Sequence, residues 1–257
     1  MADRIEKFGK DFWTVRGSFK IGRVVDIGTQ AALIRRPSGR FVLLDSYTLK
    51  GAVRNEIMAL TQNGDLLDAV LNLHPFHTVH CEEMHQTFPG ARQIGSDRHV
   101  LRFPDLSWDE ARIDDPAVWD EFSDCLEFSI PRGVDFISRN ESVHFSSVLA
   151  YHPGSQTLHS DDTLMSFGPR RQLPVIGAPQ RLAFHPTLGQ ALEKRADAAD
   201  DFTQWAEEIA GRWRDAERVC AAHISIFETG RRGMDEHILA ALARVQNTLT
   251  KHRKKYG

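Results

Sequence analysis

Residues 66–80 read LLDAVLNLHPFHTVH, a mostly apolar stretch followed at once by three histidines. Short apolar runs of this kind are typical of buried strands. The histidines His74, His77 and His80 begin where this strand would end, at a spacing of three and three. In α/β proteins functional side chains gather at such strand ends. Because imidazole is a common ligand of zinc and iron, this stretch is the first candidate for a metal site.

The composition is that of an ordinary soluble globular protein. The 257 residues are 41% apolar and 26% charged, enough to bury a sizeable core, and the formal net charge is only -3. The short basic tail at residues 251–255 could touch an anionic partner, but a frayed, solvated terminus is the preferred interpretation. We therefore expect no nucleic-acid partner, and the oligomeric state stays open.

The first thirty residues and the cysteines bear on the cellular location. Residues 1–30 carry charges throughout and hold no apolar run long enough for a signal peptide or a membrane span. The three cysteines are an odd number, lie far apart and form no Cys-x-x-Cys pair, which favours buried free thiols over disulfides or a thiolate zinc site. They are Cys81, Cys125 and Cys220. We expect a cytoplasmic protein without membrane contact.

Two blocks of short strands, each followed by helices, organise the chain. Strands are expected over 12–15, 23–27, 31–36, 41–45, 66–73, 126–130, 134–138, 146–151, 156–159 and 218–221. Helices are expected over 52–62, 78–88, 188–195, 200–214 and 234–251, and the segment 101–124 is expected to be irregular. This order favours an α/β fold with two sheets packed face to face and helices outside, in one domain over residues 1–257.

Further candidate ligands lie at or beside the ends of later predicted strands. The spacing of the first three histidines is weak evidence alone, since such a run could equally be a solvated loop. The same placement recurs along the chain, however, at His144, His159, His185, His223 and the pair Asp161-Asp162. The two aspartates could instead cap a turn. His152, before Pro-Gly, is interpreted as a turn residue.

That order of strands and ligands resembles the metallo-β-lactamase-fold superfamily over roughly residues 12–225. The superfamily's first motif has the pattern His-x-His-x-Asp-His between a strand and a helix. Residues 77–80 match its second half in spacing, with Val79 where the superfamily has aspartate, and His74 precedes the expected first position, Pro75, by one residue. The chain thus resembles a divergent member with an altered first metal motif. If this register is right, Val79→Asp should raise metal occupancy.

The resemblance implies a four-layer αββα sandwich of two mixed sheets. It implies metal ligands at His74, His77, His80, His144, Asp162 and His223, with Asp161 competing for the place of Asp162. It also implies catalytic roles for Asp162 and for His185, which could line the pocket or bind substrate. The cofactor is expected to be one or two divalent ions, zinc first, with iron or manganese as alternatives.

Two functions follow. The first is a metal-dependent hydrolase that attacks a small-molecule ester, amide, thioester or phosphoester with a metal-bound hydroxide. The second is a non-catalytic protein of the same fold whose degenerate metal site binds a ligand or a partner, and Val79 favours it. The sequence holds no Gly-rich phosphate loop and no Gly-x-Ser-x-Gly, which argues against a nucleotide cofactor and a serine nucleophile.

Overall fold

The computed structural model describes residues 3–21, 25–26, 28–167, 180–222 and 226–257. It divides into two compact units, Met1–Phe128 with His152–Ser155, and Ser129–Tyr151 with Gln156–Gly257. A single domain over the whole chain stays a prediction.

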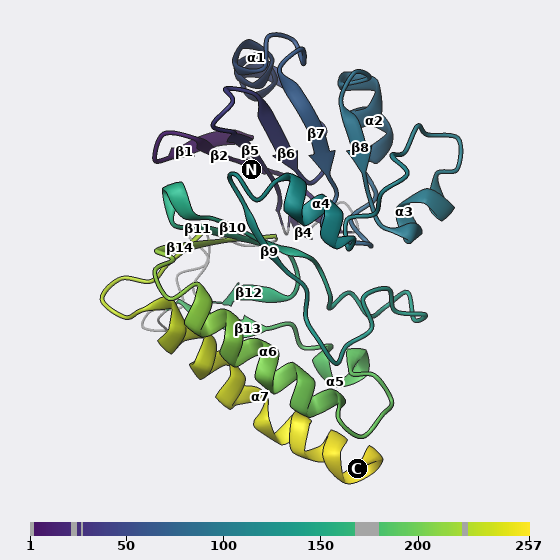
Figure 1. Ribbon diagram of the computed structural model, residues 1–257, viewed down its shortest axis with the longest axis vertical. Helices are drawn as coiled ribbons and strands as arrows, with labels where there is room; N and C mark the ends of the chain where they lie inside the picture. The colour runs from purple at the N-terminus through teal and green to yellow at the C-terminus, as the bar shows by residue number, and fades with distance from the viewer. Residues whose placement is uncertain (1–2, 22–24, 27, 168–179, 223–225) are drawn as a thin grey trace. The chain divides into compact units, whose positions relative to one another are not determined.

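The first unit holds a six-stranded mixed sheet with the strand order β1-β2-β5-β6-β7-β8 (Figure 1). The strands are β1 (Arg4–Phe8), β2 (Phe12–Gly17), β5 (Thr29–Arg35), β6 (Phe41–Leu44), β7 (Leu67–Leu71) and β8 (Arg92–Ile94). Neighbours from β1 to β6 are antiparallel, whereas β6, β7 and β8 are parallel. A separate pair is formed by β3 (Lys20–Ile21) and β4 (Val25–Asp26). The parallel strands matter for function because their carboxyl ends meet at one edge.

Helices cover one face of this sheet. The first unit contains α1 (Gly51–Leu60), α2 (Cys81–Thr87), α3 (Asp97–Arg102) and α4 (Pro116–Glu121). Val53 and Ile57 of α1, spaced four apart, are buried in one cluster with Leu43 of β6 and with Met84 of α2. Side chains four apart lie on the same side of a helix, so the apolar face of α1 packs on the sheet.

A second sheet has five strands in the order β15-β14-β11-β10-β9, and together with a two-stranded hairpin it belongs mainly to the second unit; Glu127 and Phe128 of β9 and His152 of β10 are counted with the first. The strands are β9 (Glu127–Ser129), β10 (Leu149–His152), β11 (Thr157–Ser160), β14 (Arg218–Ala221), β15 (Ile226–Glu228), and the hairpin pair β12 (Leu164–Phe167) and β13 (Arg181–Phe184). This sheet is also mixed, because β11 and β14 are parallel while β14 and β15 are antiparallel.

Two long helices cover the core of the second unit. After the short α5 (Leu188–Ala191), α6 (Ala198–Arg212) and α7 (Met234–Tyr256) run side by side (Figure 1). Trp205 and Trp213 are fully buried and pack in one cluster with Leu158 and Val219 of the sheet. These tryptophans are therefore packing residues of the second unit.

Most predicted elements are present, but several boundaries were wrong. The predicted strand 134–138 is reduced to one isolated bridge between Val134 and Leu192. The chain bends there, because Gly133 has φ 70°. Only glycine fits this residue, since a Cβ would lie 2.0 Å from the carbonyl oxygen of Ala198. The predicted helix 188–195 ends at Ala191.

The segment expected to be irregular contains short helices. Within residues 101–124 lies α4, which begins with Pro116 and is capped by the side chain of Asp115, an acceptor for the N–H of Ala117. Asp followed by Pro is a common start of a helix, and it is visible in the sequence. A search for apolar periodicity does not detect it. No helix in the described part of the chain is both long and apolar enough to cross a membrane.

Candidate metal centre

The parallel strands of the first unit deliver polar side chains to one edge. Leu44, Leu71 and Ile94 are paired at the ends of β6, β7 and β8. Just beyond these ends come Asp45, His74 and His99. Because all three strands point the same way, these side chains belong to the same edge of the sheet.

Asp45 is a candidate ligand that sequence reasoning missed. Its side chain is 3% exposed, its φ is 61°, and its Oδ1 accepts the N–H of Leu73 at 2.8 Å. A buried carboxylate in a strained backbone position next to a candidate ligand is typical of functional sites. The signal was an aspartate directly after the fully buried strand Phe41–Leu44.

His74 and His77 form a compact pair. Their rings are stacked with centroids 4.0 Å apart and planes 14° apart, and each offers a ring nitrogen within 4.8 Å of the other. His74 is completely buried and His77 is half-buried. Two imidazole nitrogens this close can share one metal ion.

The hydrogen bonding of His74 bears on whether this residue can bind a metal ion. The N–H of Phe76 donates to Nδ1 of His74 at 3.0 Å, so Nδ1 carries the lone pair and Nε2 carries the proton of the neutral ring. Histidines that bind metal normally show the reverse, with the non-ligating nitrogen donating its proton. A metal on Nε2 of His74 therefore requires this bond to break.

His80 has the arrangement that metal ligands usually show. It occupies the N-cap position of α2, and its Nδ1 lies 2.9 Å from Oγ1 of Thr48, which donates its own proton to Glu83 at 2.8 Å. The hydroxyl can only accept from His80, so Nδ1–H donates and Nε2 keeps its lone pair. Among the described residues that buried Nε2 has no hydrogen-bond partner. Burial lowers the pKa of His80, against the opposing charge of Glu83.

Val79 stands at the position where the resemblance expects an aspartate. Its side chain is 67% exposed, whereas His74 is fully buried. The helix predicted from residue 78 begins only at Cys81, and residues 75–76 and 79–80 form turns before it. The side chain of an aspartate at position 79 would therefore lie in solvent, away from the buried donors.

His99 follows β8 and is fully buried. Its Nδ1 accepts the N–H of Ser96 at 3.1 Å. Burial lowers its pKa to about 3, reinforced by the nearby His74 and opposed by a hydrogen bond to the backbone of His77. We interpret His99 as a neutral support for the His74–His77 turn.

The second unit carries acidic donors at the end of a strand. Asp161 and Asp162 follow β11 and are 1% and 2% exposed, and His159 within β11 is fully buried. His159 and Asp161 offer ligand atoms within 4.8 Å of each other. The parallel neighbour β14 ends at Ala221. His223, the last ligand implied by the resemblance, lies outside the described residues.

Hydrogen bonds fix the turn after the two aspartates. Oγ1 of Thr163 donates to the carbonyl of Phe145 at 2.9 Å and accepts the N–H of Ser147 at 2.9 Å. Oγ of Ser160 accepts the N–H of Leu164 at 3.2 Å. Buried hydroxyls satisfied in this way hold the backbone in one conformation, which positions the aspartates between them.

His144 and His185 occupy other places in the second unit. Nε2 of His144 donates to the carbonyl of Glu141 at 2.5 Å, so Nδ1 is the nitrogen left with a lone pair. Nδ1 of His185 accepts the N–H of Thr187 at 3.2 Å, so its Nε2 carries a proton and can donate. Both side chains are half-buried. His144 remains a predicted ligand, and His185 is a candidate hydrogen-bond donor.

No family model and no curated protein matches the sequence. The fold, in contrast, is similar to solved metallo-β-lactamases. The enzyme from Pontibacter korlensis is 11% identical and aligns with a TM-score of 0.59 over 95% of this chain and 99% of its own. The enzyme FIM-1 from Pseudomonas aeruginosa, in its mono-zinc form, is 9% identical, with a TM-score of 0.60 over 95% and 96%.

A third structure, the metallo-β-lactamase from Hirschia baltica, is 12% identical and aligns with a TM-score of 0.57 over 93% of this chain and 97% of its own. The chain therefore has the metallo-β-lactamase fold, whose architecture is the αββα sandwich, at a sequence distance that leaves activity open. The resemblance inferred from the sequence is confirmed at the level of the fold, and both units carry buried His and Asp groups that could bind a metal ion.

Proposed function

We propose that this chain is a metal-dependent hydrolase that acts on an ester, amide, thioester or phosphoester of a small molecule. One observation carries the proposal, namely that buried histidines and aspartates follow strand ends in both units of a metallo-β-lactamase fold. Buried titratable groups gathered beside strand ends are typical of functional sites in α/β folds, so their concentration supports a binding role.

The donor set suits a divalent ion of the zinc, iron or manganese type. The first unit supplies imidazole nitrogens and one carboxylate, and the second supplies two carboxylates and further imidazoles. We propose that one or two ions are held by donors chosen from His74, His77, His80, Asp45, His144, His159, Asp161, Asp162 and His223. Mixed nitrogen and oxygen ligands are what zinc and iron bind in hydrolytic centres.

Each part of the site then has a chemical task. When bound, the ion supplies a hydroxide near neutral pH and polarises the scissile carbonyl or phosphoryl group. The carboxylate of Asp162 would accept, as a general base, the proton that the water loses when it becomes this hydroxide. The Nε2–H of His185 donates a hydrogen bond to the oxygen on which negative charge develops.

Elemental analysis of the purified protein tests the proposal first. We expect at least one zinc, iron or manganese per chain, and we expect Asp162→Asn to lose metal and hydrolysis of p-nitrophenyl esters or phosphates together. Asp114→Asn is the matched control, because Asp114 is exposed on the first unit and lies outside the donor set. A wild-type chain that stays folded without taking up any of the three metals would overturn the proposal.

A second function is favoured by a specific observation. Nδ1 of His74 accepts the N–H of Phe76, which is the reverse of the usual pattern for a metal ligand, and Val79 replaces the aspartate that the resemblance expects. The alternative is a non-catalytic protein whose degenerate site binds an ion or a ligand without turnover. Stoichiometric metal together with no hydrolysis across the same substrate set would favour it.

A further inference from the structure

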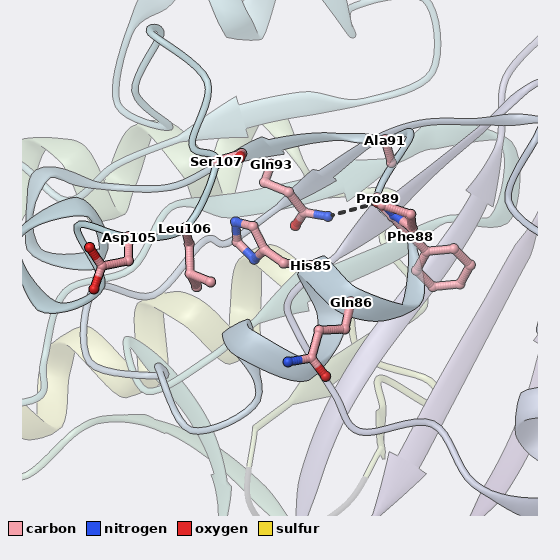
Figure 2. A pocket seen from close by; sticks show the side chains of 9 residues that line it. All are labelled: His85, Gln86, Phe88, Pro89, Ala91, Gln93, Asp105, Leu106 and Ser107. Carbon is pink, nitrogen blue, oxygen red and sulfur yellow. Dashed lines mark hydrogen bonds between the residues drawn. The ribbon is translucent and has the colours of Figure 1, made fainter.

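A hollow of about 210 Å³ lies in the first unit, lined by the last turn of α2, the start of β8 and residues 105–107 (Figure 2). Pro89 and Ala91 precede the first residue of β8, Arg92, so the hollow is at the amino end of this strand. The proposed metal donors follow the carboxyl ends, which makes this a separate site.

His85 presents a lone pair on this side of α2. Its Nδ1 lies 2.8 Å from the carbonyl of Cys81, which can only accept, so Nδ1 donates and Nε2 is unprotonated. Trp108 packs edge-on against the ring with centroids 4.5 Å apart, which fixes its orientation. Nε2 is buried and has no hydrogen-bond partner among the described residues. Burial lowers the pKa of His85 and so favours the neutral ring.

Gln93 is a second buried acceptor in the same wall. Its side chain is 3% exposed, and its Nε2 donates to the carbonyl of Phe88 at 3.4 Å, the bond drawn in Figure 2. Turning the amide round would place its oxygen against that carbonyl, so the assignment holds. Oε1 is then the free end, and no described residue donates to it. A buried carbonyl oxygen without a donor is costly, and a ligand N–H would satisfy it.

The remaining wall adds a negative charge and apolar surface. Asp105 is exposed at the rim, while Phe88 and Leu106 contribute apolar atoms. No lysine or arginine is among the described residues that line the hollow. Two acceptors and a carboxylate, with no opposing cation, attract a positively charged donor.

We propose that this hollow is a second binding site, for a small organic cation with several N–H donors and an apolar body, such as an amidinium or a primary amine. Its N–H groups reach the acceptors of His85 and Gln93, its charge pairs with Asp105, and its apolar part lies against Phe88 and Leu106. The charge gives selectivity over neutral and anionic molecules of the same shape.

The test uses benzamidine as the probe, with benzamide and benzoate as neutral and anionic molecules of similar shape. Binding to the full chain is measured by NMR titration, following the imidazole signals of His85. We expect saturable benzamidine binding with a Kd of about 1 mM or below, and at least tenfold weaker binding of benzamide and benzoate.

Variants locate the site. Asp105→Asn changes an exposed rim residue, leaves the fold intact and is expected to weaken benzamidine binding several-fold. His85→Phe keeps a ring against Trp108 but removes the nitrogen, and is expected to weaken binding at least tenfold. Glu82→Gln, on the exposed side of the same helix, is the control and should bind as the wild type does. Equal binding of benzamidine and benzoate, or benzamidine binding unchanged in both site variants, would overturn the proposal.

Discussion

The imidazole rings of His74 and His77 lie face to face, with centroids 4.0 Å apart and planes 14° apart. Stacking has two effects here, since it packs the buried turn and places two nitrogen donors together. A substitution that keeps the stacked ring but removes its nitrogens separates the packing effect from metal ligation. Truncation to alanine would remove both at once.

His77→Phe is therefore expected to lose the bound metal while the chain stays folded. The phenyl ring continues to stack on His74, so the loss reports ligation alone. Metal content by elemental analysis and the thermal midpoint of unfolding are measured on the same sample. A variant that retains the wild-type metal content would show that His77 is not a ligand.

Val79→Asp is expected to leave metal content unchanged, contrary to what the sequence register suggested. The side chain at this position is 67% exposed, so a carboxylate there remains hydrated and does not join the buried donors. Occupancy is measured after dialysis against a chelator of moderate affinity. A clear rise in retained metal would restore the original register of the motif.

Thr48 is expected to act on the metal through His80. Its hydroxyl accepts from Nδ1 of His80 and donates to Glu83, which leaves Nε2 of His80 with its lone pair. Removing such a supporting bond typically weakens metal affinity by roughly 10–100-fold. Thr48→Val keeps the shape and removes the bonds, and a competition titration with a chromogenic chelator measures the change.

The control for Thr48 lies on the neighbouring helix. Oγ1 of Thr87, at the other end of α2 from His80, donates to the carbonyl of Glu83. Thr87→Val should keep the wild-type affinity. If Thr48→Val does so as well, His80 does not contribute to the metal site.

The sequence predicted the edge of the first sheet well, because an apolar strand followed by histidines is a local pattern. It did not predict Asp45, whose importance depends on β6 and β7 being parallel neighbours, a relationship between segments far apart in the chain. It also left the ring tautomers open. The bonds of His74 to Phe76 and of His80 to Thr48 depend on turn geometry that composition and spacing do not encode.

Substitution of Gly17 is expected to destabilise the chain for steric reasons. A Cβ at this position would lie 2.1 Å from the ring of Tyr47, which in turn packs edge-on against His80 at 5.1 Å between centroids. Gly17→Ala forces Tyr47 to move and should lower the free energy of unfolding by about 1–3 kcal/mol. Gly90→Ala, where nothing lies within 4 Å of the added atom, should change it little. Urea denaturation of both variants measures their free energies of unfolding. Equal values would contradict the close approach of Gly17 to Tyr47.

The buried thiols predict a loss of stability at alkaline pH. Burial raises the pKa of Cys81 and of Cys125 from 9.0 to about 12. The folded chain therefore holds these two protons in a range where the unfolded chain has released them, so the free energy of unfolding falls as pH rises from about 9 to 12. Each thiol contributes a slope of about 1.4 kcal/mol per pH unit at most. Cys125→Ala removes one of the two thiols with a raised pKa, so it should reduce the slope of the free energy of unfolding between pH 9 and 11. An unchanged slope in this variant would mean that the Cys125 thiol ionises in the folded chain as easily as in the unfolded one.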